Sequence, residues 1–144
     1  MIYILDTDIL TFLLREESAQ RACVEEKILE LPDEDIILTT IINYEEQVRG
    51  WMSFLAQTRS ATEEIHAYER LSKQLEFFKK LTMLAYDMSA ARIFADLRKH
   101  RIRIGSMDLK IAAIALASNG TLITWNTVDF QRVPDLRIAD WSFE

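Results

Sequence analysis

The sequence is poor in residues that interrupt regular structure or build special sites: its 144 residues include three glycines, two prolines and one cysteine. With so few turn-forming residues, we expect short connections and long helices. The single Cys23 excludes an internal disulfide, and no partner histidine marks it as a nucleophile. No apolar run approaches the ~20 residues of a membrane span, and no signal peptide is recognisable. We therefore expect a cytoplasmic protein without membrane association.

Acidic residues outnumber basic ones. There are 17 Lys and Arg residues against 23 Asp and Glu residues, which gives a net charge of −6. This balance argues against broad, sequence-blind nucleic-acid binding, because positive charge supplies the affinity there. It leaves a nuclease open, because a carboxylate pocket attracts phosphate once it holds metal. Apolar residues make up 49%, enough for a core, and the length fits one domain over residues 1–144.

Short apolar segments alternate with helical patterns along the chain. We expect strands at residues 2–5, 36–38, 83–86, 122–125 and 136–139. We expect helices at about 8–15, 18–31, 40–57, 60–81, 87–100 and 106–118, the third and fourth as a helical hairpin. Strands separated by helices predict an α/β sandwich with a mostly parallel sheet of about four to five strands, flanked by helices. Asp8 is expected to cap the first helix, with Asp6 as the alternative, and Gly120 to end the sixth in a left-handed conformation.

Acidic residues follow several of these strands. Asp6 comes directly after the first strand, at the carboxyl edge of the sheet, where ligands bind in open α/β folds. A carboxylate there costs free energy unless it caps a helix, pairs or binds metal. Glu45, Glu46, Asp108 and Asp129 lie in segments that lead to the same edge. Such a cluster cannot stay fully ionised without a cation, so the sequence predicts a metal site.

Each of these acids also has an ordinary structural explanation. A pair of glutamates in a helix is usually a solvated face, and the helical pattern alone does not choose between Glu45 and Glu46. Asp108 near a helix start is favoured by the helix dipole. Asn126 and Asp129 are both common in turns. It is their joint placement at strand ends and helix starts that favours a shared site.

Four segments resemble, in order, the four motifs of PIN-domain ribonucleases. They are Ile-Leu-Asp-Thr-Asp-Ile-Leu at 4–10, Thr-Thr-Ile-Ile-Asn-Tyr-Glu-Glu-Gln-Val-Arg-Gly at 39–50, Ile-Gly-Ser-Met-Asp-Leu-Lys-Ile-Ala-Ala at 104–113, and Leu-Ile-Thr-Trp-Asn-Thr-Val-Asp-Phe at 122–130. The resemblance spans the chain and is greatest to the VapC toxins of type II toxin–antitoxin pairs. It departs from them at Trp125, where a basic or small polar residue is frequent, and at Asp8, where Asn is more frequent.

The resemblance implies an acidic quartet of Asp6, Glu46, Asp108 and Asp129, with Asn126 as an alternative to the last. Glu46 is selected because it lies four residues before a glycine. One or two Mg²⁺ or Mn²⁺ ions would be held first by Asp6 and Asp108, and a metal-activated water would hydrolyse an RNA phosphodiester without a covalent nucleophile. The products would carry a 5′-phosphate and a 3′-hydroxyl. Implied partners are a tRNA, rRNA or mRNA substrate, a VapB-type antitoxin and a second copy of the chain.

Other interpretations remain at this stage. The basic segment 98–103 either provides phosphate contacts or places cations at a helix C-terminus. A haloacid-dehalogenase-like phosphatase would use Asp6 as nucleophile and Asp8 as acid or base, although the later lysine and acidic loop of that class are not recognisable. A catalytically inactive PIN-like binding module is a third interpretation. The aromatic residues Trp51, Tyr68, Phe77 and Phe78 are expected in the core or a dimer contact rather than as a base-stacking surface.

Overall fold

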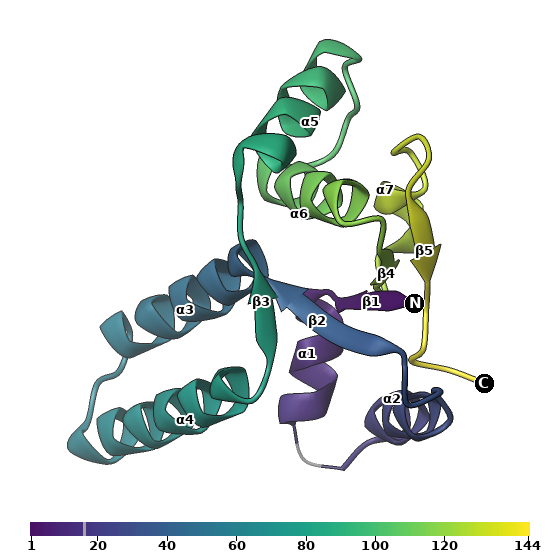
Figure 1. The fold of residues 1–144 in the computed structure, drawn as a ribbon. Helices are drawn as coiled ribbons and strands as arrows, with labels where there is room; N and C mark the ends of the chain where they lie inside the picture. Colours follow the sequence, from purple (N-terminus) through teal and green to yellow (C-terminus); the bar gives the residue numbers. More distant parts are fainter. Residues whose placement is uncertain (16) are drawn as a thin grey trace.

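A five-stranded parallel sheet forms the centre of the computed structural model, which describes residues 1–15 and 17–144 (Figure 1). The strands are β1 (Ile2–Leu5), β2 (Ile36–Thr40), β3 (Thr82–Leu84), β4 (Thr121–Ile123) and β5 (Arg137–Ala139), in the order β3-β2-β1-β4-β5. The helices are α1 (Thr7–Leu14), α2 (Ala19–Leu29), α3 (Ile41–Ala56), α4 (Ala61–Lys79), α5 (Met88–Lys99), α6 (Ser106–Ala117) and α7 (Thr127–Phe130). The predicted α/β fold with a largely parallel sheet is confirmed.

Both faces of the sheet are covered, which explains why the strands are apolar without alternation. Neighbouring side chains in a strand point to opposite faces. Ile4 of β1 accordingly joins the core formed with α5 and α6, whereas Leu5 joins the core formed with α1 and α2. β1 is the central strand, and Ile4 lies opposite Leu38 of β2 and Leu122 of β4. The central position of β1 brings its carboxyl end between those of two neighbours.

Helices α3 and α4 form the predicted antiparallel hairpin, which projects away from the sheet (Figure 1). Burial on α3 is concentrated at its first residues, Ile42 and Asn43, whereas α4 buries Gln74 and Phe78 toward its end. The Tyr44 and Phe78 rings meet edge to face with centroids 5.1 Å apart. The base of the hairpin is therefore packed, while the turn at 57–60 is largely exposed.

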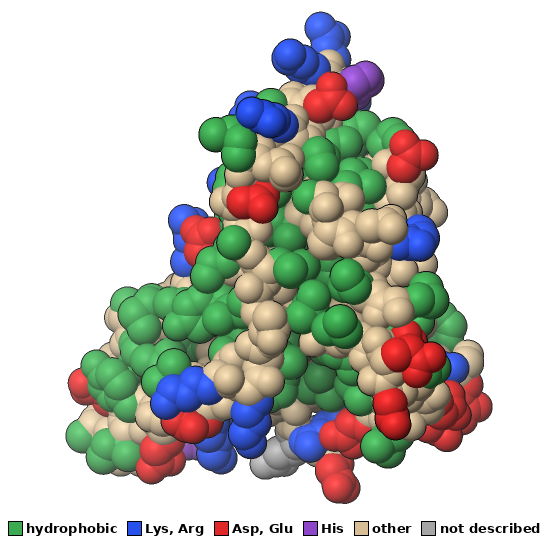
Figure 2. Space-filling view, in the orientation of Figure 1, with side chains coloured by type: hydrophobic (Ala, Val, Ile, Leu, Met, Phe, Trp, Pro, Cys, Tyr) green, Lys and Arg blue, Asp and Glu red, His purple; other side chains and the backbone are tan. Residues whose placement is uncertain are grey.

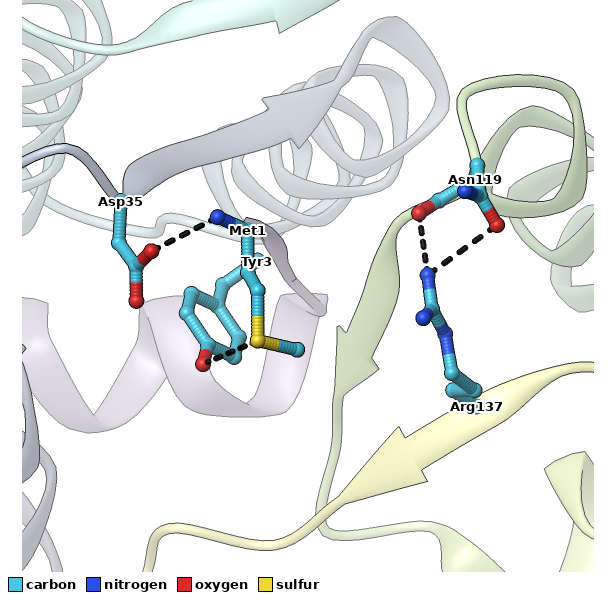
Figure 3. Close-up of polar contacts among 5 residues, drawn as sticks. All are labelled: Met1, Tyr3, Asp35, Asn119 and Arg137. Atoms are coloured by element: carbon cyan, nitrogen blue, oxygen red, sulfur yellow. Dashed lines mark hydrogen bonds and ion pairs between the residues drawn. The ribbon is translucent and has the colours of Figure 1, made fainter.

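Polar contacts join segments at the edge of the sheet where the strands begin, opposite to the edge that holds their carboxyl ends (Figure 3). The amino group of Met1 lies 2.7 Å from Oδ1 of Asp35, and the Tyr3 hydroxyl lies 3.5 Å from the Met1 sulfur. On β5, the Arg137 guanidinium donates to the backbone carbonyl and side-chain oxygen of Asn119. These contacts join β1 to the start of β2, and β5 to the connection between α6 and β4.

Two details of the connections differ from the sequence-based predictions. Asp6, not Asp8, is the N-cap of α1, and its side chain accepts from the Thr7 amide. Asn119, not Gly120, takes the left-handed conformation after α6, with φ of 55°. Glycine is needed at 120 for space, because a Cβ there would lie 2.7 Å from Cδ1 of Ile4. The short helix α7 was not predicted.

Among the described residues, no helix is both long enough and apolar enough to cross a membrane.

Candidate active site

Asp6 lies at the centre of the carboxyl edge and is 5% exposed. Because it ends β1 and caps α1, its carboxylate faces the helix N-terminus, where backbone amides stabilise negative charge. Its Oδ1 accepts from the Thr7 amide at 2.8 Å and from Nδ2 of Asn43 at 3.0 Å. Its Oδ2 accepts from the Thr124 hydroxyl at 2.7 Å. Residues of α1 and α3 and the residue that follows β4 thus fix this one side chain.

Asn43 is a residue that the sequence analysis did not select. It is fully buried, and its side-chain oxygen accepts from the Thr40 hydroxyl at 2.7 Å. This contact orients the amide so that Nδ2 donates to Asp6 and to the Thr7 hydroxyl, each at 3.0 Å. Burying an amide is costly unless it is hydrogen-bonded. The available signal was a polar residue at the buried start of an apolar helix, directly after β2.

Asp8 supplies a further carboxylate on α1. Its Oδ1 accepts from the Ile9 amide at 2.7 Å and its Oδ2 from the Trp125 amide at 3.1 Å. The Thr124 hydroxyl lies 3.4 Å from the same Oδ2, but its single proton favours the shorter contact with Asp6. Burial, followed by the Asp6 charge, raises the pKa of Asp8 to about 6. Thr124 therefore links Asp6, and the Trp125 amide links Asp8, to the segment that follows β4.

The two glutamates of α3 have different surroundings. Glu45 pairs with Arg49 on the exposed side of the helix, with a nitrogen–oxygen distance of 2.7 Å. Glu46 is half-buried, and its Oε1 is buried without a hydrogen-bond partner among residues 1–15 and 17–144. Burial, then the charges of Asp6 and Asp108, raise the pKa of Glu46 to about 7. The structure places Glu46, not Glu45, with the acidic cluster.

Asp108 and Asp129 complete the cluster from the other side. Asp108 lies in the first turn of α6, and burial, then the charge of Asp129, raise its pKa. Burial is also the largest cause of the raised pKa of Asp6, and Asp108 contributes to it. Asp129 lies on α7, where its Oδ2 accepts from Nδ2 of Asn126 at 3.0 Å and its Oδ1 is 3.8 Å from Arg132. Asp129 is thus the more peripheral carboxylate, and Asn126 holds it in place.

The donor set fits a hard divalent cation in its chemistry. Mg²⁺ and Mn²⁺ prefer oxygen ligands, and the cluster offers carboxylates whose pKa values are raised by burial and by one another. The unpartnered buried oxygen of Glu46 is also suited to a cation. Among the described residues, no three Asp, Glu, His or Cys side chains lie close enough together to form a complete set of metal ligands.

Positive charge lies in a cavity next to this cluster. A cavity of about 450 Å³ between α1, α3 and α4 is lined by Arg15, Arg70 and Lys73, among others. It shares Thr11, Gln47 and Trp51 with a second cavity of about 320 Å³ that includes Glu46.

The basic segment 98–103 lies at the end of α5, where basic side chains gather at the apex of the molecule (Figure 2). Its link to the acidic cluster is indirect. Nη1 of Arg132, the partner of Asp129, donates to the carbonyl of Arg103 at 2.9 Å.

Comparison with known proteins identifies the family to which the fold belongs. The PIN domain family matches residues 3–136. Ribonuclease VapC1 of Haemophilus influenzae strain R2866 is 29% identical over 142 residues, which cover 99% of each chain. Among solved structures, VapBC-1 from nontypeable H. influenzae is 29% identical, with a TM-score of 0.71 and 98% of each chain covered. VapBC2 from Rickettsia felis, bound to a DNA fragment from their promoter, is 26% identical, with a TM-score of 0.76 and coverage of 98% and 99%. The chain therefore belongs to the PIN domain family, rather than to the haloacid-dehalogenase-like phosphatases.

Proposed function

We propose that this protein is a VapC-type toxin, an endoribonuclease that hydrolyses RNA phosphodiesters at a Mg²⁺- or Mn²⁺-dependent carboxylate site in the cytoplasm. The observation that carries the proposal is the convergence of acidic side chains from β1, α3, α6 and α7, several with raised pKa values. The relatives that share this fold over nearly the whole chain include proteins named as ribonucleases. Carboxylates that are buried together and raise one another's pKa values are characteristic of functional sites.

The residues of the cluster take different roles in this proposal. Asp6 and Asp108 would hold the divalent ion, which would lower the pKa of a bound water and offset charge on the scissile phosphate. Glu46 would bind the ion directly or orient the attacking water, and in the metal-free protein burial and the neighbouring carboxylates raise its pKa to about 7. Asn43 keeps the Asp6 carboxylate oriented through its 3.0 Å hydrogen bond. Asp129 supports the opposite side of the cluster.

The substrate is RNA, drawn from tRNA, rRNA or mRNA. The overall charge of −6 does not attract a polyanion, so local cations must supply the attraction. The cavity beside Glu46 provides them through Arg15, Arg70 and Lys73. We infer that the RNA backbone follows this cavity toward the carboxylates. Contacts of this type position the strand but do not read its sequence.

The proposed protein partners are a VapB-type antitoxin and a second copy of the chain. The relatives of known structure include VapBC assemblies. The α3–α4 hairpin exposes large apolar side chains, namely Met52, Phe54, Ile65, Tyr68 and Leu75. Figure 2 shows hydrophobic side chains gathered over this part of the molecule. Exposed apolar surface of this extent is typical of a protein contact.

The direct test is cleavage of end-labelled cellular RNA by the purified protein. We expect cleavage with Mg²⁺ or Mn²⁺, none in EDTA, and recovery when Mn²⁺ is added back. Asp6→Asn should abolish cleavage with the fold retained, whereas Asp96→Asn, an exposed acid on α5, should not affect it. Cleavage in EDTA would contradict the metal mechanism. Cleavage by Asp6→Asn would contradict the role proposed for Asp6. A catalytically inactive binding module would neither cleave RNA nor bind Mn²⁺ in calorimetry.

A further inference from the structure

Trp125 is the unusual residue at the rim of the cluster. It follows β4 and is 61% exposed, whereas the C-terminal Trp141 is 8% exposed and belongs to the core. One exposed apolar side chain on a protein surface needs no explanation by itself. The position of Trp125 along the chain is what makes it informative.

Both neighbours of Trp125 contact carboxylates of the proposed active site. The hydroxyl of Thr124 donates to Asp6 at 2.7 Å, and the side-chain amide of Asn126 donates to Asp129 at 3.0 Å. The backbone amide of Trp125 itself donates to Oδ2 of Asp8 at 3.1 Å. Residues 124–126 thus make three hydrogen bonds to carboxylates along the edge of the cluster, two through side chains and one through the backbone.

The indole ring of Trp125 also packs against another aromatic side chain. The ring of Phe12 meets it edge to face, with centroids 5.7 Å apart and an interplanar angle of 65°. Phe12 is 7% exposed and lies one helical turn after Asp8, so the same face of α1 holds both the backbone and the ring of Trp125. A ring ordered before binding loses little conformational entropy on binding. This support leaves most of the indole surface free for a ligand beside the carboxylates.

We propose that Trp125 is a stacking platform for a nucleobase of the RNA substrate, next to the phosphodiester that is cut. This inference rests on the ribonuclease function proposed above. The carboxylate site accounts for a phosphate through its metal but offers little apolar surface to a base, and Trp125 supplies that surface. Any base can stack, so the contact positions the strand without dictating its sequence. The ties to Asp6, Asp8 and Asp129 favour this occupant over a protein contact, which the exposed apolar side chains of the α3–α4 hairpin accommodate elsewhere.

The test compares cleavage of short oligoribonucleotides by the native protein and three variants. Loss of one base–aromatic stack weakens binding about tenfold or more, so Trp125→Ala should raise KM by that factor with little change in kcat. Trp125→Phe should restore much of the loss. Val128→Ala is the matched control, because Val128 is equally exposed at 61% and lies on α7. An unchanged KM in Trp125→Ala would overturn the proposal.

A second arm identifies the base. Oligonucleotides that each lack one base are compared with the intact oligonucleotide. At one position beside the cut, loss of the base should raise KM for the native protein but should not raise KM for Trp125→Ala above its value with the intact oligonucleotide. If every such penalty persists in Trp125→Ala, the ring does not stack on a base. If Trp125→Ala weakens self-association or antitoxin binding while RNA kinetics stay unchanged, the ring is a protein contact and the proposal is wrong.

Binding to the Asp6→Asn protein separates this inference from the proposed function. Native protein that cleaves no RNA contradicts the ribonuclease proposal. The single variant Asp6→Asn and the double variant Asp6→Asn/Trp125→Ala are compared for oligonucleotide binding without cleavage. Equal affinity of the two variants contradicts the stacking proposal, whatever the outcome for cleavage.

Discussion

Replacing Glu46 with Gln should make the protein more stable and inactive at the same time. In the metal-free protein, ionised Glu46 lies half-buried among other carboxylates, which is why its pKa is about 7 instead of the ordinary 4.5. Ionising it at neutral pH costs the folded state up to about 3 kcal/mol, and partial access to solvent reduces this to about 1–2 kcal/mol. Glutamine removes the charge at nearly the same volume, so the variant should gain this amount.

The sign of the effect sets a pH window. Between pH 4.5 and 7 the folded protein retains the proton of Glu46 while the unfolded chain releases it. The stabilising contribution of this proton is therefore complete below pH 4.5 and lost as the pH rises through 7. Native protein and Glu46→Gln should have similar stability near pH 4.5 and differ fully at pH 8, by about 3–6 °C in Tm for a chain of this size.

The assay is thermal unfolding in EDTA, followed by circular dichroism from pH 4.5 to 8. Glu45→Gln is the matched control, because it loses only the exposed pair with Arg49, worth about 0.5 kcal/mol or less. Its Tm should follow the native protein at every pH, and its RNA cleavage should persist, while Glu46→Gln loses cleavage. A Glu46→Gln protein that is less stable at pH 8, or equally shifted at pH 5, would refute the reasoning.

Three further outcomes are expected. Gly120→Ala should lower the free energy of unfolding by about 1–3 kcal/mol, because its Cβ would press on β1, whereas Gly50→Ala, with open space around its Cβ, should be neutral or slightly stabilising; equal effects in urea unfolding would contradict this account. Asn43→Leu should cost about 2–4 kcal/mol and most of the activity, because it leaves buried polar partners unpaired; native-like unfolding and turnover would show that the amide is dispensable. Lys73→Glu should raise KM for RNA at low salt far more than Lys79→Glu on the same helix, since Lys73 lines the cavity and Lys79 pairs with Glu76; equal effects would place the RNA elsewhere.

The strands and the long helices could be predicted because both faces of the sheet are buried and the helices have clear apolar periodicity. The failures are local and have physical causes. α7 is four residues long, too short for any periodicity. Gly120 was predicted to supply a left-handed turn, but its role is to leave room for Ile4, a residue far away in the sequence. Asp6 and Asp8 are equally good caps by residue type, and only the end of β1 decides between them.

The acidic residues could be found from the sequence, but the groups that orient them could not. The hydrogen bonds from Asn43 and Thr124 to Asp6 join residues 37 and 118 positions apart, so a local pattern can mark Asn43 as a buried polar residue but cannot show which carboxylate it contacts. The difference between Glu45 and Glu46 depends on how α3 is rotated against the sheet, which the helical pattern left open. The catalytic roles of Asp6, Glu46, Asp108 and Asp129 remain predictions, to be tested by the substitutions above.

The uneven burial of the α3–α4 hairpin has a consequence for amide hydrogen exchange. Its base is held by packing and by the hydrogen bond from Gln74 to Gln47 at 2.8 Å, whereas residues 57–66 are almost entirely exposed. Local opening should therefore begin at the tip, with fast deuterium uptake there and slow uptake around Asn43. A bound protein that covers the tip would slow this fast exchange, whereas one that covers only the base would leave it unchanged. The pattern of protection would therefore reveal which part of the hairpin contacts the partner.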